Sequence, residues 1–302
     1  SPSTQGRKRS GTKPRTLQAT YPIALMARVL GVSRQGYYQW RARSQARRQR
    51  VLARAEFDRV VACVFDDYQR THGAPRLVAA LAKVGVVADK KTIAASLKRQ
   101  GLEAVSTRSF YRPTTTGTDG CDYEDHCQRQ WDQGAIDLVW ITDFTYLRCG
   151  EGWVYLVAVR DAHSRRVLGY AMGQQQTTGL LIEALQMAIE TRGGAMPGQV
   201  VLHADRGTQF TSKRLAQHAD TAGIVMSMGR TGVCWDNAMA ESFWATLKVE
   251  YYYRHTFRIR EEVYEGVATW IEGFYNHKRI HSAIGYQSPV EYELHAGLDL
   301  AA

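Results

Sequence analysis

The 302-residue sequence has few cysteines and few prolines, and it has no long apolar run. Its five cysteines are an odd, sparse set, which argues against a disulfide framework and favours a reducing compartment. No apolar stretch approaches the roughly 20 residues that a membrane-spanning helix needs, and no signal peptide is recognisable. The 44% hydrophobic content excludes a wholly disordered or fibrous chain. The sequence therefore predicts about two globular domains and no membrane partner.

Acidic residues are scarce in the first part of the chain. Residues 1–118 contain 23 of the 39 Lys and Arg but only 6 of the 29 Asp and Glu, a balance of +17. The remainder carries −7, within a total of +10. A basic segment can bind nucleic-acid phosphates by releasing counterions, although a solvated surface is the alternative. The acidic segment suits nucleic-acid chemistry only if its carboxylates hold metal ions.

The basic part predicts helices that contact DNA. After a flexible basic arm over 1–18, apolar residues at helical spacing run from Ile23 to Leu30, Gly31 breaks the pattern, and Ser33 can cap a second helix. This predicts a helix-turn-helix, with an ordinary helical hairpin as the alternative. A longer helix over 45–67 follows. After it comes a helical pair, whose first helix begins at Pro75 and whose second covers 90–100. The expected DNA-contacting residues here are Arg34, Gln35, Tyr37, Tyr38, Arg41, Arg43, Lys91, Lys98 and Arg99.

A Thr- and Gly-rich stretch at 114–120 marks the boundary between the two parts. We expect a helical DNA-binding region over 19–113, a linker over 114–136 and an α/β region over 137–302. The first predicted strand contains the apolar run 138–141 and ends at Asp143. Further strands are predicted over 153–159, 167–172, 199–204 and 224–226. Helices are predicted over 177–191, 211–221, 237–252 and 261–275. This order indicates a mixed sheet flanked by helices.

Three carboxylates in the α/β region have distinctive positions. Asp143 and Asp205 follow apolar strands, and Glu241 lies near the start of a helix, so the three can converge at one sheet edge. Oxygen ligands suit Mg²⁺ or Mn²⁺, and two such ions support phosphoryl transfer. Lys248 lies two turns after Glu241 on the same helix face and can contact nucleic acid. Glu250 faces the opposite way and is a poor ligand.

Other candidates have competing structural interpretations. Cys121, His126 and Cys127 lack a second ligand pair, so free thiols are favoured over a zinc site. Asp161 is interpreted as a turn residue. His203 and His281 could each pack in the protein interior or take part in the site, and the sequence favours neither role.

Asp205 and Glu241 are separated by 35 residues. With this spacing, the chain resembles the DDE transposases with a retroviral-integrase-like core, more narrowly the OrfB-type product of the insertion sequence three family. The resemblance covers about residues 20–295. The segments that carry it are Leu30–Tyr38, Thr71–Arg76, Trp140–Tyr146, Trp153–Leu156, Asp161–Arg165, His203–Phe210, Gly232–Ala238, Glu241–Lys248 and Tyr275–His281.

The resemblance implies an α/β RNase-H-like core with a C-terminal helical segment over 137–302, preceded by an all-α helix-turn-helix region. It implies Asp143, Asp205 and Glu241 as catalytic residues and ligands of two Mg²⁺ ions, for which Mn²⁺ can substitute. A water or a 3′ hydroxyl would attack phosphorus in line. Lys248 and Arg279 would contact DNA, although Arg279 could instead tie down the last helix.

The same resemblance implies copy-out–paste-in transposition through a circular intermediate. The double-stranded DNA partners would be the element's terminal inverted repeats and the target, bound by a homodimer or larger assembly. The implied location is the bacterial cytoplasm, at the nucleoid. A non-catalytic DNA-binding regulator and an RNase-H-fold nuclease without strand transfer are the alternatives.

Overall fold

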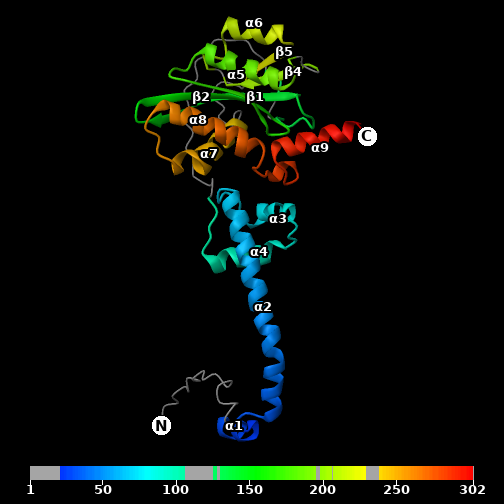
Figure 1. Cartoon of the computed structure of the whole chain (residues 1–302). Helices are drawn as coiled ribbons and strands as arrows, with labels where there is room; N and C mark the ends of the chain where they lie inside the picture. The colour runs from blue at the N-terminus through cyan, green and yellow to red at the C-terminus, as the bar shows by residue number, and fades with distance from the viewer. Residues whose placement is uncertain are drawn as a thin grey trace, which may run out of the picture. The chain divides into compact units, whose positions relative to one another are not determined.

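The computed structural model describes residues 21–105, 125–127, 130–194, 198–205, 207–228 and 238–301. The chain forms two compact units, residues 1–60 and 61–302. Helix α2 (Arg34–Asp67) begins in the first unit and ends in the second (Figure 1). The predicted linker at 114–120 lies outside the described residues, so the expected boundary there stays a prediction. Among the described helices, none is both long and apolar enough to cross a bilayer.

The first unit contains α1 (Ile23–Leu30), a tight turn and the start of α2. Gly31 ends α1 in the left-handed region, with φ +65°, where glycine has no Cβ to clash. The Ser33 hydroxyl oxygen accepts a hydrogen bond from the Gly36 N–H at 2.9 Å, which confirms the predicted cap. The separate helix expected from residue 45 is wrong, because α2 is continuous and no Gly or Pro interrupts it after Gly36.

A second helical pair follows, and it confirms the predicted positions. Helix α3 (Ala74–Lys83) has Pro75 in its first turn, where the missing N–H costs no hydrogen bond. Helix α4 (Lys90–Gln100) is capped by Asp89, whose carboxylate accepts from the Lys91 and Thr92 amides at 2.7 and 2.9 Å. The two helices pack through buried apolar residues that include Leu77, Leu81, Ile93 and Leu97.

The second unit is built around a five-stranded sheet in the order β3-β2-β1-β4-β5. Strands β1 (Val139–Cys149), β2 (Gly152–Asp161) and β3 (Val167–Gly173) are antiparallel neighbours. Strands β4 (Val200–Ala204) and β5 (Ile224–Met228) run parallel to β1. The expectation that β1 ends at Asp143 is wrong. Residues 144–149 continue the strand because they pair with residues 152–157 in a hairpin.

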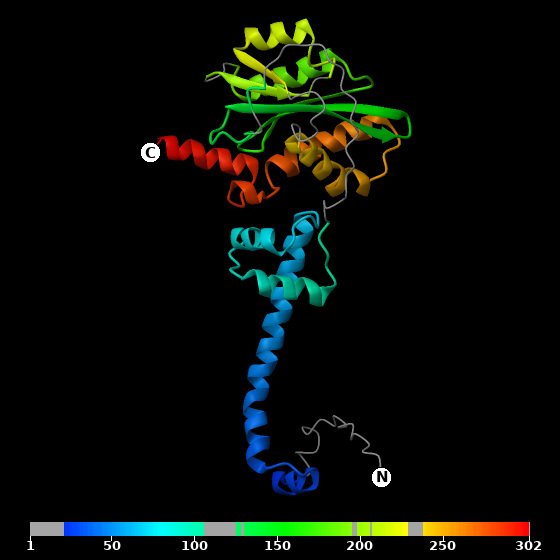
Figure 2. The ribbon, with the colours of Figure 1, turned by 180° about the vertical axis from the view of Figure 1, so that it is seen from behind.

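Helices cover both faces of this sheet (Figures 1 and 2). On one face lie α5 (Thr178–Thr191) and α6 (Lys213–Thr221). On the other lie α7 (Ala238–Glu250) and α8 (Arg260–Thr269). The main apolar core, which includes Trp140, Leu168, Leu181, Leu202 and Phe210, lies under α5 and α6.

The C-terminal part extends beyond the sequence expectation. A short 3-10 helix (η2, Tyr252–Arg254) links α7 to α8, and α8 continues as a π-helical segment (η3, Trp270–Asn276). A 3-10 turn (η4, Ser282–Ile284) and helix α9 (Pro289–Ala301) follow. The resemblance implied a C-terminal helical segment, but the residue pattern predicted no helix at the position of α9.

Candidate active site

Strand register brings Asp143 and Asp205 to the same level of the sheet. In the parallel pairing of β1 with β4, Ile141 lies opposite His203, and each aspartate comes two residues later. Side chains alternate along a strand, so Asp143 shares a face with Val139 and Ile141. Those two residues and Val201 pack against Met239 and Ala240 of α7. The two aspartates therefore extend the row of side chains that faces α7.

Helix α7 brings Glu241 and Lys248 to the same face. Glu241 lies in the first turn of α7. One turn later, the Trp244 indole N–H donates a hydrogen bond to Asp143 Oδ2 at 3.0 Å. The Lys248 ammonium lies over the Tyr146 ring, 5.0 Å from its centroid. Burial lowers the pKa of Lys248, and the charge of Asp143 partly opposes that shift. Helix α7 thus places Trp244 and Lys248 beside Asp143, with Glu241 one turn before Trp244 on the same helix.

The electrostatics of the acids suit a cation. Burial raises the pKa of Asp205, and the hydrogen bond that its Oδ1 accepts from the Gly207 N–H at 2.9 Å only partly offsets this. Burial also raises the pKa of Glu241. Asp205 is exposed overall and Glu241 is half-buried, so both shifts reflect a partial loss of water around the carboxylates. A set of carboxylate oxygens is the donor chemistry that Mg²⁺ and Mn²⁺ prefer, so these residues fit such an ion.

Glu250 does not join this group, as the helical spacing predicted. Its side chain is 1% exposed, and both oxygens accept hydrogen bonds from Arg279 at 2.7 Å. The ion pair ties the end of α7 to the segment after η3. Arg279 is itself only 4% exposed, so its guanidinium is held inside the protein. Asp161 is buried and accepts the His163 and Ser164 amides, which is the turn role expected from the sequence.

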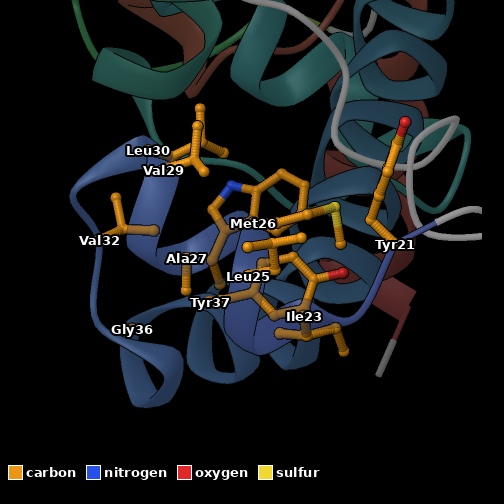
Figure 3. A pocket seen from close by; sticks show the side chains of 11 residues that line it. Tyr21, Ile23, Leu25, Met26, Ala27, Val29, Leu30, Val32, Gly36 and Tyr37 are labelled. Carbon is orange, nitrogen blue, oxygen red and sulfur yellow. The ribbon is translucent and has the colours of Figure 1, made fainter.

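The expected DNA-contacting residues of the helical region are mostly exposed. Those on α2 are Arg34, Gln35, Tyr38, Arg41 and Arg43, and those on α4 are Lys91, Lys98 and Arg99. Tyr37 differs, because it lines an apolar pocket of about 530 Å³ between α1 and the start of α2 (Figure 3). Its ring centroid lies 6.2 Å from that of Trp40, so Tyr37 has a packing role.

A second group of possible ligands lies beside the carboxylates. The ligand atoms of Asp125, Cys127 and His203 all lie within 4.8 Å of one another. Burial raises the pKa of the Cys127 thiol to about 11, so it is protonated at neutral pH. His126 contributes only its backbone N–H, which donates to Ser227 Oγ at 3.0 Å. Cys121 lies outside the described residues.

Sequence reasoning missed one residue beside the site, Trp244, and one that packs on the other side of α7, Arg160. Trp244 orients Asp143, and its position three residues after Glu241 is the signal that could have revealed it. Arg160 packs its guanidinium over the Phe243 ring of α7, 5.2 Å from the centroid. It had no comparable signal, because the contact joins β2 to a helix about 80 residues away in the chain.

Two family models match the second unit of this chain. Residues 136–234 match a family described as "Integrase core domain", and residues 222–289 match a second family with the same description. The catalytic core domain of HTLV-2 integrase, solved in complex with magnesium, aligns with a TM-score of 0.40 at 15% identity. That alignment covers 53% of this chain and 97% of that core.

Relatives match nearly the whole chain. "Transposase InsF for insertion sequence IS3A" of Escherichia coli (strain K12) is 38% identical over 281 residues, covering 91% of this chain and 95% of the relative. The "Insertion element IS600 uncharacterized 31 kDa protein" of Shigella sonnei is 34% identical over 268 residues, covering 88% of this chain and 97% of that relative. This chain therefore belongs to the IS3 family of transposases, enzymes of the polynucleotidyl transferase class, and its second unit contains their RNase-H-like integrase core.

Proposed function

We propose that Asp143, Asp205 and Glu241 hold two Mg²⁺ ions, for which Mn²⁺ can substitute, and form the centre at which the enzyme cleaves DNA and transfers a strand. The observation that carries this proposal is the register of β1 and β4, which aligns the two aspartates on the face that α7 covers. The Trp244 hydrogen bond to Asp143 supports it, because it fixes α7 beside the same carboxylate.

The protein's own groups prepare this centre for phosphoryl transfer. When bound, the metal ions would activate the attacking oxygen and stabilise the leaving oxygen. Trp244 holds one oxygen of Asp143, and the Gly207 amide holds one oxygen of Asp205, so both carboxylates are oriented before DNA arrives. Lys248 places a positive charge next to Asp143, where a backbone phosphate would lie.

We further propose that the helical region binds the terminal inverted repeats of the element. Its exposed basic residues on α2 and α4 suit phosphate contacts, and the helix-turn-helix of α1 and α2 suits groove recognition. Pairing two element ends needs a homodimer or a larger assembly. We also propose copy-out–paste-in transposition with a circular intermediate, which membership of the IS3 family supports. Detection of circular element junctions in cells would test it.

The decisive experiment is strand transfer on labelled element ends with Mg²⁺. Mutating a residue that only hydrogen-bonds to a metal ligand typically lowers metal affinity or activity by about 10–100-fold. Glu241→Gln changes a proposed ligand itself, so it should lower strand joining by more than about hundredfold while DNA binding persists. Glu261→Gln, the same change at an exposed site on α8, is the matched control and should join normally.

Each alternative has its own outcome. Equal joining by the Glu241→Gln protein would refute the assignment of that residue. Cleavage without joining in the wild type would indicate a nuclease. Binding without cleavage in both proteins would indicate a DNA-binding regulator.

A further inference from the structure

A cavity of about 270 Å³ lies on the side of α7 away from Glu241. Its α7 wall includes Met239 and Thr246. At about 100° per residue, these positions lie roughly 160° and 140° around the helix from Glu241, and so on the side away from Glu241 and Lys248. The cavity is therefore separate from the proposed catalytic centre, although both adjoin the same helix. The other walls carry four arginines from four segments: Arg76 of α3, Arg160 of β2, Arg165 of the β2–β3 turn and Arg279 after η3.

These four guanidinium groups have too few carboxylate partners. Within the described ranges, the carboxylates at ion-pair distance are Glu250, 2.7 Å from Arg279 and 3.8 Å from Arg76, and Asp132, 3.7 Å from Arg165. Asp132 is also shared with a second side chain, because its Oδ1 lies 2.6 Å from His163 Nδ1. The cavity therefore carries an excess of positive charge.

Arg160 and Arg279 have structural roles that account for part of this cluster. Arg160 donates a hydrogen bond to the Met239 carbonyl oxygen at 2.6 Å, and Arg279 is held by Glu250. Arg165 is explained only in part, because its Nη1 donates to Met239 Sδ at 3.0 Å and its Nη2 lies 3.7 Å from Asp132. Its Nε is buried and has no hydrogen-bond partner among the described atoms. Its backbone also has φ +68°, a left-handed conformation that bulky residues adopt at an energetic cost.

Like charges at this site oppose one another. Burial and the neighbouring Arg160 lower the pKa of Arg165, and burial and Arg279 lower the pKa of Arg76. Burial and the same four arginines hold the pKa of His281 well below its usual value, so this ring is neutral. An anion in the cavity would reduce the repulsion between these guanidinium groups.

We propose that the arginine cavity binds a phosphate group. Guanidinium groups donate in planar forks, and here they approach from four segments. A tetrahedral phosphate has oxygens that can accept from several directions at once, whereas a carboxylate has two oxygens in one plane. The phosphate can come from a DNA backbone or from free inorganic phosphate. The proposal does not rest on the three carboxylates, because binding requires neither metal nor strand transfer.

The test uses the full chain without metal and two variants with the same change. Arg165→Gln removes the guanidinium whose buried Nε has no hydrogen-bond partner among the described atoms. Arg214→Gln removes an exposed arginine on α6, outside the cavity. Binding of inorganic phosphate is measured by calorimetry at constant ionic strength, and binding of a DNA duplex is measured as a function of salt. Unfolding curves check that both variants fold.

Because Arg165→Gln removes a charged hydrogen-bond donor, it should weaken phosphate binding by at least about tenfold, and Arg214→Gln should not. If the phosphate belongs to DNA, Arg165→Gln should also reduce the slope of log K against log salt by about 1, more than Arg214→Gln does. A loss of phosphate binding with no excess slope change identifies free phosphate as the source. Equal effects of the two variants on both measurements, or no effect, would overturn the proposal.

Discussion

His72 shows how a buried ionisable residue joins distant parts of the second unit. Its Nε2 accepts a hydrogen bond from the Ile280 N–H at 3.2 Å, so Nδ1 carries the proton and donates to Thr71 Oγ1 at 2.8 Å. The Thr71 hydroxyl in turn donates to the Tyr68 carbonyl oxygen. This arrangement requires a neutral ring. Burial and the nearby Arg76 lower the pKa of His72 to about 2.

Stability should therefore depend on pH through His72. Below a pH of about 6.5, the unfolded chain binds a proton at this residue and the folded chain does not. The free energy of unfolding should lose about 2 kcal/mol from this residue between pH 7 and pH 5. Denaturant unfolding of wild type and His72→Gln at both pH values measures this contribution. An identical pH-dependent loss in the two proteins would contradict the assignment.

At the scale of elements, the contact of α5 with β3 depends on Gly169. A Cβ placed on this residue would lie 2.1 Å from the Ala184 carbonyl oxygen and 2.6 Å from the Ala188 amide nitrogen. Both are backbone atoms of α5, so no side-chain rotation can relieve the overlap. The helix packs closely on the strand because the side chain is absent.

Gly169→Ala should consequently push α5 away from the sheet and destabilise the protein by about 1–3 kcal/mol. Gly179→Ala, within α5 itself, is the control, because a Cβ there meets only Thr177 Oγ1, at 3.7 Å. It should be neutral or stabilising by up to about 1 kcal/mol. Thermal unfolding distinguishes them, and equal stability of the two variants would argue against this packing.

At the scale of the second unit, α9 and the α3–α4 pair are both attached by contacts between distant residues. Glu293 of α9 accepts hydrogen bonds from Arg192 at 2.8 and 2.9 Å, from Arg166 at 2.6 Å and from Ser164 at 2.7 Å. Lys83 of α3 pairs with Glu291 of α9 at 2.5 Å. The Lys83–Glu291 pair joins α3 to α9, and α3 and α4 belong to the same compact unit as the sheet.

Removing the Glu293 charge should release α9 from the core. Glu293 is largely buried, so Glu293→Gln leaves Arg192 and Arg166 without their carboxylate and should cost about 3 kcal/mol. Limited proteolysis should then cut near α9 sooner than in wild type. Glu261→Gln, at an exposed position, serves as the control. Unchanged stability and cleavage rate would show that α9 is held by other contacts.

The sequence alone predicted most elements of the fold. Helix α4, the hairpin of β2 and β3, and the start of α5 were confirmed at or near their predicted ends, because local signals such as Pro75, Ser33 and alternating apolar residues act over a few positions. Those signals could not show that β1 continues past Asp143 or that α2 is uninterrupted. Strand β1 continues past Asp143 because it pairs with β2. Helix α2 runs without a break from Arg34 to Asp67.

The sequence by itself determined the family of this transposase and the identity of the three candidate acids, because both depend on residue types at fixed spacing. Only the tertiary structure decided which side chains meet. It aligned Asp143 with Asp205 through strand register, paired Glu250 with Arg279, and assembled four arginines from separate segments around one cavity. Such contacts join residues far apart in the chain, so their geometry depends on packing rather than on local sequence.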